Sequence, residues 1–239
     1  MENPSRTAEY LERMEARRRS LRARQAQILP PQARFTWEIG SGHGHFLTAY
    51  AQSHPTELCI GIDIIGERVE RALRKRDRAS LANLHFIHAE ARLFQETLPA
   101  DATFSRLFIL FPDPWPKLRH HKHRIMQPDF LAAVAARAGA GARLYFRTDF
   151  TPYYDDTKAV LSSHPNWDIL SDGSEPWPFE HETVFQARAP SYHSLIARPK
   201  QPTTTPPNPL GEPLPPHRTH WASHSTPCHK ADAGKIRLG

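Results

Sequence analysis

The sequence predicts an α/β fold with a doubly wound, mostly parallel sheet. From Arg34 to about Lys200, short apolar runs alternate with helical patterns, as in FTWEIG followed by HFLTAYAQSH and ELCIGID followed by ERVERALRKRDRASL. Such alternation is typical of βαβ units, whose strands pair in parallel. Two loops support this fold, because one is rich in glycine, the other is rich in proline, and both follow expected strands at the edge where open α/β sheets bind ligands.

The other elements follow in order along the chain. Residues 9–27 predict a basic, exposed helix that ends before Pro30 and Pro31. After the first two units, strands are expected near residues 83–90, 104–111, 143–149, 167–170 and 192–197, and helices near 91–98, 128–138 and 152–163. Beyond residue 200 the chain is too polar and proline-rich to bury a core. We therefore expect three parts: a basic N-terminal arm at 1–33, one domain at 34–200 and a disordered Pro/His-rich tail at 201–239.

Charge and cysteine usage narrow the class of protein. The 239 residues include 31 Lys and Arg against 25 Asp and Glu, for a formal net charge of +6, which favours an acidic partner. Cys59 lies in an apolar strand and Cys228 in a polar tail, which is unlike a disulfide framework and suits a reducing cytoplasm. The sequence contains neither an apolar run long enough to span a membrane nor a secretory signal, so we expect no membrane association.

The first expected strand ends in a glycine-rich turn, EIGSGHG, at residues 38–44. Gly40 and Gly42 let the backbone turn tightly and approach a ligand without a Cβ in the way. In the dinucleotide fingerprint G-x-G-x-x-G the turn serves a pyrophosphate, but here the third glycine comes one residue early and Glu38 precedes the turn. This pattern favours a cationic ligand over an anionic one.

Acidic residues end the first three expected strands, namely Glu38, Asp63 and Glu90. Asp63 lies 23 residues after Gly40, close to the offset at which an acid usually meets ribose hydroxyls in such folds. Three acids around a glycine turn suit S-adenosylmethionine, whose sulfonium and amino groups are positive and which carries no phosphate. Alternatively, these acids are N-caps of the helices that follow the strands.

A proline-rich loop, FPDPWPKLRHHKHR, occupies residues 111–124. Its three prolines fix their own φ and push the preceding residues towards extended conformations, so Asp113 and Trp115 lie on stiff backbone. Trp115 is either a stacking surface for a base or a buried structural residue. The basic run that follows predicts phosphate contacts, for which we select Arg119, Lys122 and Arg124. The arginines of the N-terminal arm either contact RNA too or belong to a plain exposed helix.

Taken together, these motifs make residues 34–200 similar to the tRNA (guanine-N7-)-methyltransferase family. The resemblance rests on EIGSGHG at 38–44, GID at 61–63, FPDPWPK with RHHKHR at 111–124, TDF at 148–150 and TVFQ at 183–186. It implies a Rossmann-like class I S-adenosylmethionine-dependent methyltransferase fold whose final strand is antiparallel. It also implies a cytoplasmic enzyme that forms N7-methylguanosine at position 46 of the tRNA variable loop.

The resemblance assigns a role to each candidate site residue. It implies cofactor contacts for Glu38, Gly40, Gly42, Asp63, Glu90 and Asp113, with Asp113 also at the catalytic position. It implies substrate contacts for Lys117, Asp149, Thr183, Val184, Phe185 and Gln186. It implies no metal ion and no obligatory protein partner, so the enzyme is expected to be a monomer or a homodimer.

The chain departs from the family pattern at four positions. Asp63 stands where Glu is frequent and Glu90 where Asp is common, exchanges that keep the charge and move it by one methylene. His123 replaces a usual Arg or Lys, which makes phosphate affinity sensitive to pH near neutrality. Gln186 replaces a Glu and loses a charge.

The expected chemistry agrees with this resemblance. Guanine N7 carries an in-plane lone pair and no proton, so alignment with the methyl donor is the main requirement. Asp113 is expected to accept hydrogen bonds from guanine N1 and N2 and to offset the positive charge that grows on the base.

Two other functions compete with this one. A catalytically silent RNA-binding protein with the same fold would not need the set Glu38, Asp63, Asp113 and Asp149. An amino-methyltransferase is disfavoured because its D-P-P-[YFW] arrangement is absent from the proline-rich loop.

The tail beyond residue 200 has no counterpart in the family pattern. It contains possible zinc ligands, His217, His220, His224, Cys228 and His229. A flexible polar extension that adds weak RNA affinity through Lys230, Lys235 and Arg237 is the favoured interpretation.

Overall fold

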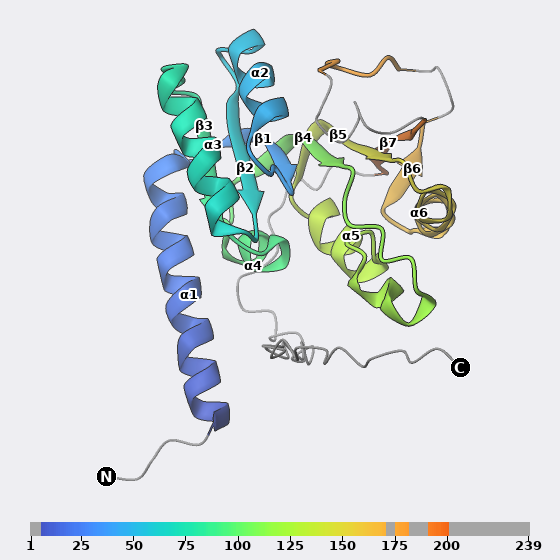
Figure 1. Ribbon diagram of the computed structural model, residues 1–239, viewed down its shortest axis with the longest axis horizontal. Helices are drawn as coiled ribbons and strands as arrows, with labels where there is room; N and C mark the ends of the chain where they lie inside the picture. Colours follow the sequence, from blue (N-terminus) through green and yellow to red (C-terminus); the bar gives the residue numbers. More distant parts are fainter. Residues whose placement is uncertain (1–5, 171–174, 182–190, 201–239) are drawn as a thin grey trace, which may run out of the picture. The chain divides into compact units, whose positions relative to one another are not determined.

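The computed structural model describes residues 6–170, 175–181 and 191–200. Within these residues seven strands form one sheet in the order β3-β2-β1-β4-β5-β7-β6 (Figure 1). The strands are β1 Arg34–Ile39, β2 Leu58–Asp63, β3 Leu84–His88, β4 Thr103–Leu110, β5 Ala138–Thr148, β6 Trp167–Ile169 and β7 His193–Pro199. The first five pair in parallel, whereas β7 is antiparallel to both β5 and β6. The predicted doubly wound sheet with an antiparallel final strand is confirmed.

The helices cover both faces of this sheet. They are α1 Arg6–Ile28, α2 His45–Ser53, α3 Gly66–Arg78, α4 Ala91–Thr97, α5 Pro128–Ala135, α6 Thr151–Ser163 and a short 3-10 helix, η1, at Leu118–His123. Buried residues of α2 and α3 form one apolar cluster with one side of the sheet, and those of α1, α4, α5 and α6 form another with the opposite side.

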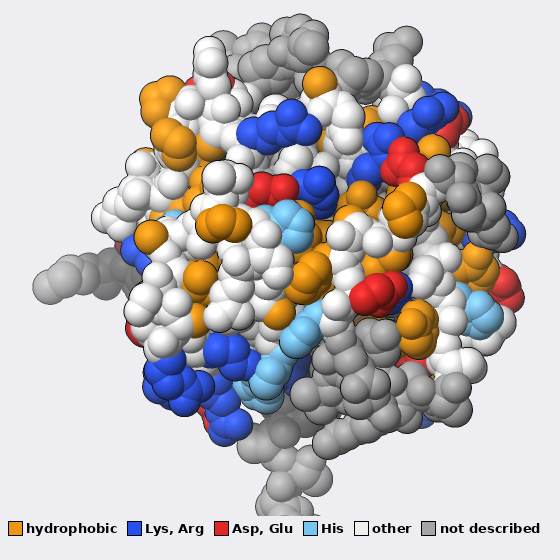
Figure 2. Space-filling view, turned by 90° about the horizontal axis from the view of Figure 1, so that it is seen from above, with side chains coloured by type: hydrophobic (Ala, Val, Ile, Leu, Met, Phe, Trp, Pro, Cys, Tyr) orange, Lys and Arg blue, Asp and Glu red, His pale blue; other side chains and the backbone are white. Residues whose placement is uncertain are grey.

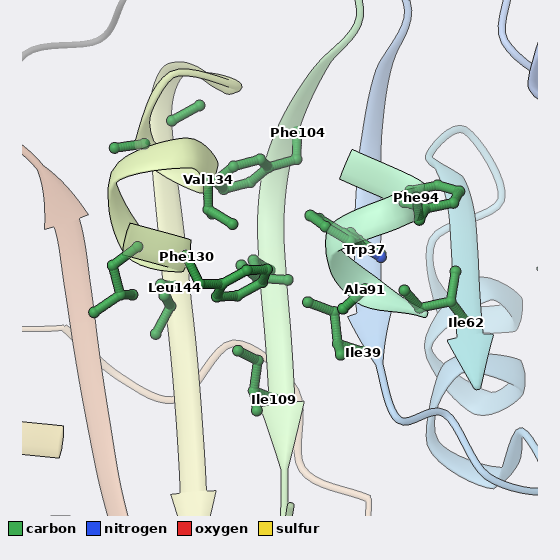
Figure 3. Packing of buried hydrophobic residues seen from close by; sticks show 14 of the residues in the cluster. Trp37, Ile39, Ile62, Ala91, Phe94, Phe104, Ile109, Phe130, Val134 and Leu144 are labelled. Carbon is green, nitrogen blue, oxygen red and sulfur yellow. The ribbon is translucent and has the colours of Figure 1, made fainter. Parts of the chain in front are cut away.

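The larger cluster shows why the strand sequences are almost wholly apolar. Figure 3 shows Phe94 of α4 and Phe130 of α5 lying against Trp37, Ile109 and Leu144 from three neighbouring strands. Strands covered on both faces need apolar residues at successive positions. Burying each large apolar side chain stabilises the fold by roughly 1.5–3 kcal/mol.

The N-terminal helix differs from the exposed arm that the sequence predicts. In its second half Leu21 and Gln25 are buried, and Gln25 donates a hydrogen bond of 2.9 Å to the carbonyl of Phe94 in α4. Arg18 forms an ion pair with Glu96 at 2.8 Å. Only its first half is exposed throughout from residue 7 to residue 13. The helix is therefore partly docked on the domain, because a few apolar positions and one buried amide suffice to hold it.

Within the described ranges, no helix combines the length and the apolar character that a membrane crossing requires. Residues 201–239, which contain the predicted disordered tail and its alternative zinc ligands, lie outside the described residues, and so do Thr183, Val184, Phe185 and Gln186.

Candidate functional site

The candidate site lies where the strand order reverses. The chain passes from β1 outward through β2 and β3, then returns to form β4 on the other side of β1. The strands β1 and β4 are neighbours, and their carboxyl ends lie at the same edge of the sheet. From this edge the chain continues towards β2 on one side and towards β5 on the other. This topological switch point is where open α/β sheets bind ligands.

The glycine-rich turn leaves open space above its backbone. Gly40 and Gly42 have left-handed φ values of 75° and 52°, and a Cβ added at either position would meet nothing within 4 Å. At Gly44, by contrast, a Cβ would lie 2.5 Å from the ring of Phe86. The first two glycines thus have free space beside their backbone, while the absence of a Cβ at the third allows the start of α2 to pack closely against Phe86.

Asp63 fixes the shape of this turn. Its Oδ2 accepts a hydrogen bond of 2.9 Å from the amide of Gly42, and its Oδ1 accepts one of 2.8 Å from the amide of Ile65. The side chain is buried, with 4% of the residue exposed. One carboxylate at the end of β2 therefore holds the turn after β1 and the entry to α3 together.

Glu38 is buried beneath the turn. Its burial, and secondarily the charge of Asp63, raises its pKa to about 8, although a hydrogen bond from the Leu47 backbone opposes the shift. Its Oε2 has no hydrogen-bond partner among the described residues. An unpaired buried carboxylate oxygen is costly, and a cation placed beside it would remove that cost. Glu38, Asp63 and the open glycines thus fit the positively charged S-adenosylmethionine.

Glu90 has a different environment from the other two acids. It is exposed and is the N-cap of α4, because its side chain accepts a hydrogen bond of 2.9 Å from the amide of Leu93. For this acid the structure shows the capping role that the sequence left open. A cofactor contact by Glu90 stays a prediction.

The proline-rich loop after β4 is held in an uncommon conformation. Phe111 and Trp115 have left-handed φ values of 49° and 43°, which bulky residues rarely adopt without support from their surroundings. Asp113 lies between them and is exposed. Strained backbone on either side restricts where the Asp113 carboxylate can lie.

Arg124 supplies part of that support, and the predicted phosphate contact by Arg124 is wrong for this structure. The residue is buried with 3% exposed, donates a hydrogen bond of 2.8 Å to the carbonyl of Pro114, and forms an ion pair with Asp156 of α6. Its guanidinium lies 4.6 Å from the ring centroid of Tyr153. The charge is used inside the protein to anchor the loop, so it does not face a nucleic acid.

Trp115 is exposed to 37%, which supports the stacking interpretation over a buried structural role. Its ring lies 5.1 Å from that of His123 and 5.8 Å from that of His120. Lys117, Arg119 and Lys122 beside it are exposed and remain available for phosphate. In the view of Figure 2, some Lys and Arg side chains lie beside acidic ones and others form a group of their own. The net charge of the chain therefore does not by itself show where a nucleic acid would bind.

Asp149 follows β5, the strand next to β4, with Leu110 paired to Arg147 at their ends. Like Asp113, Asp149 is exposed. Neither carboxylate has a hydrogen-bond or ion-pair partner in the part of the chain that the structure describes. Two neighbouring strand ends thus present carboxylates that are ready to accept hydrogen bonds.

Sequence comparisons agree with this geometry. Residues 32–194 match the model of a family described as "Putative methyltransferase". The tRNA (guanine-N(7)-)-methyltransferase of Synechococcus sp. (strain JA-2-3B'a(2-13)) is 38% identical over 135 residues, which cover 56% of each chain. That of Caulobacter vibrioides (strain NA1000 / CB15N) is 35% identical over 159 residues, which cover 65% of this chain and 70% of the relative.

The chain thus spans little more than half the length of the Synechococcus relative. Among solved structures, TrmN from Thermus thermophilus is 17% identical with a TM-score of 0.49, and the match covers 76% of this chain and 48% of that one.

Proposed function

Because the chain belongs to the tRNA (guanine-N(7)-)-methyltransferase family, we propose that it transfers a methyl group from S-adenosylmethionine to N7 of guanine 46 in the variable loop of tRNA. The observation that carries this proposal is the buried, partly unpaired Glu38 beneath an open glycine turn, next to the strand end that bears Asp113. We further propose that the enzyme acts in the cytoplasm, as a monomer or homodimer, without a metal ion or an obligatory protein partner.

The residues around the glycine turn serve the methyl donor. S-adenosylmethionine, when bound, supplies a methyl group that its sulfonium makes electrophilic. Glu38 and Asp63 provide negative charge for its cationic groups, and Gly40 and Gly42 give it room. Glu90 and Asp113 are the further contacts that family resemblance implies.

The residues after β4 and β5 serve the guanine. Its N7 lone pair needs no general base, so orientation is the main task and can contribute on the order of 7–11 kcal/mol. Asp113 accepts hydrogen bonds from the donors on N1 and N2, and Asp149 shares this role. Both carboxylates offset the positive charge that develops on the base.

The tRNA itself must be held and locally opened. Turning a base out of its stack costs a few kcal/mol, and Trp115 offers a surface against which a displaced base can stack. Lys117, Arg119 and Lys122 bind the backbone phosphates. The segment with Thr183, Val184, Phe185 and Gln186 completes the substrate contacts by family resemblance.

The test is methylation of an unmodified tRNA transcript with methyl-labelled S-adenosylmethionine, followed by nucleoside analysis and mapping of the label. We expect 7-methylguanosine in the variable loop. Asp113→Ala is expected to abolish transfer and to retain the fold and most tRNA binding. Tight tRNA binding without any transfer by the natural chain would instead support a catalytically silent RNA-binding protein.

A further inference from the structure

Residues 175–181, called the strap here, are held against β5 at both ends by ion pairs of the same kind. Arg143 donates to the two carboxylate oxygens of Glu175 at 2.8 and 2.5 Å. Arg147 donates to those of Glu180 at 2.9 and 2.6 Å. Four residues apart on a strand, both arginines point to the same face of the sheet. Two bidentate ion pairs therefore hold the strap against β5, one at Arg143 and one at Arg147.

In the second ion pair Arg147 is buried and lies among aromatic rings, whereas Glu180 is largely exposed. Arg147 is exposed to only 5%. Its guanidinium carbon lies 3.8 Å from the ring centroid of Trp177 in the strap and 5.0 Å from that of Tyr192 just before β7. Its Nε donates a hydrogen bond of 2.9 Å to Ser194 Oγ. Each of the three guanidinium nitrogens of Arg147 thus already has a partner within the protein.

The same residue also holds the proline-rich loop at 111–124, called the catalytic loop here because it carries Asp113, the proposed catalytic residue. The backbone carbonyl of Arg147 accepts a hydrogen bond of 2.8 Å from the amide of Phe111, two residues before Asp113. The ring of Phe111 in turn lies edge-to-face against Tyr192, with centroids 5.9 Å apart. Arg147 thus joins the start of the catalytic loop, the strap and the entry to β7, and the next two residues lead to Asp149.

We propose that Arg147 is a positioning residue for methyl transfer, which rests on the proposed function of the same site. Its side chain holds Glu180 of the strap and packs against Tyr192, whose ring contacts Phe111. Its backbone carbonyl accepts a hydrogen bond from the amide of Phe111, at the start of the loop that carries Asp113. The rigid guanidinium fork can hold a carboxylate and stack on a ring at once, which a lysine cannot do. Since a displacement of about 1 Å can cost about 100-fold in rate, this anchoring acts on turnover.

The other end of the strap provides a matched control. Glu180→Gln and Glu175→Gln each convert the carboxylate of a bidentate pair into an amide of the same shape. Only the Glu180 pair adjoins the catalytic loop, and Glu180 itself is largely exposed, so the protein is expected to fold. For both variants one measures kcat and KM with unmodified tRNA, the Kd for S-adenosylmethionine, and the melting temperature.

We expect Glu180→Gln to lower kcat about 10- to 100-fold while the Kd for S-adenosylmethionine stays unchanged. Glu175→Gln is expected to lower the melting temperature to a similar extent and to leave kcat unchanged. Glu180→Asp, which restores a carboxylate, is expected to recover part of the lost kcat.

Three results separate this inference from the proposed function. If the natural chain forms no 7-methylguanosine, the proposed function fails and Arg147 has no reaction to position. If the natural chain is active and Glu180→Gln retains full kcat, only the positioning role is overturned. Equal losses of kcat in Glu180→Gln and Glu175→Gln would also overturn it, because they would show a general loss of stability.

Discussion

As the pH rises, ionisation of Glu38 is predicted to lower the free energy of unfolding and to raise the affinity of the site for S-adenosylmethionine. Burial and the neighbouring Asp63 raise the pKa of Glu38 from its ordinary 4.5 to about 8. Between these pH values the native state holds a proton that the unfolded chain has released, so the free energy of unfolding falls with rising pH. The full effect is on the order of 4–5 kcal/mol, reached above pH 8.

The variant Glu38→Gln removes this titration and keeps the shape of the side chain. We expect its free energy of unfolding to match that of the natural chain near pH 5 and to exceed it by a few kcal/mol above pH 8. Urea unfolding at a series of pH values measures this difference. Since other titrating groups are common to both proteins, their contributions cancel in the comparison.

Ligand binding should change in the opposite direction. A cation binds the ionised form of Glu38, so the affinity of the natural chain for S-adenosylmethionine should rise by up to about tenfold per pH unit below pH 8. Glu38→Gln should bind more weakly at pH 8 and lose this part of the pH dependence. Calorimetric titrations of both proteins at several pH values test this, and parallel pH profiles of the two would refute the reasoning.

Three further perturbations test separate parts of the site. Gly44→Ala should lower the free energy of unfolding in urea by about 2–4 kcal/mol because its Cβ meets Phe86. Gly42→Ala should lower it by about 1–2 kcal/mol because of the left-handed φ, and its main effect should be weaker S-adenosylmethionine binding in calorimetry. Equal binding losses would contradict this distinction. Lys122→Ala should lower the slope of log affinity against log salt concentration by about 1 in tRNA filter-binding assays, and an unchanged slope would exclude a phosphate contact. Arg124→Lys should destabilise the fold by about 1–3 kcal/mol and reduce methyl transfer more than tRNA binding, because it loosens the loop rather than a phosphate contact. Preferential loss of tRNA binding would reverse that assignment.

The sequence predicted the sheet well because strand patterns depend on local burial. Apolar runs such as FTWEI and LCIGID coincide with β1 and β2. The docking of α1 was missed, since it depends on contacts with residues far away in the sequence, such as the hydrogen bond from the Gln25 amide to a carbonyl 69 residues later. Arg124 was misassigned for a related reason. In the sequence it is the last member of an exposed basic run, and Asp156, which binds it, lies 32 residues later in α6.

Arg147 escaped notice because an arginine inside the run RLYFRTD resembles an ordinary surface position of a strand. The available signal was its spacing: Arg143, Tyr145 and Arg147 alternate with apolar residues and so share one face. Two arginines on a face of a central strand require acidic partners from another segment. Glu175 and Glu180 have nearly the same separation, but no local rule connects them to β5.

The three acids at successive strand ends show how burial divides roles that the sequence presents as equal. Glu90 is exposed and caps a helix, so its charge is already used by a backbone amide. Asp63 is buried, but two amides satisfy it and make it part of the scaffold. Glu38 alone combines burial with an oxygen that lacks a partner in the described part of the chain. Among the three acids, Glu38 therefore gains most from a positive charge beside it. Glu38 should contribute most to the difference in affinity between S-adenosylmethionine, whose sulfur is positively charged, and the demethylated product, whose sulfur is neutral.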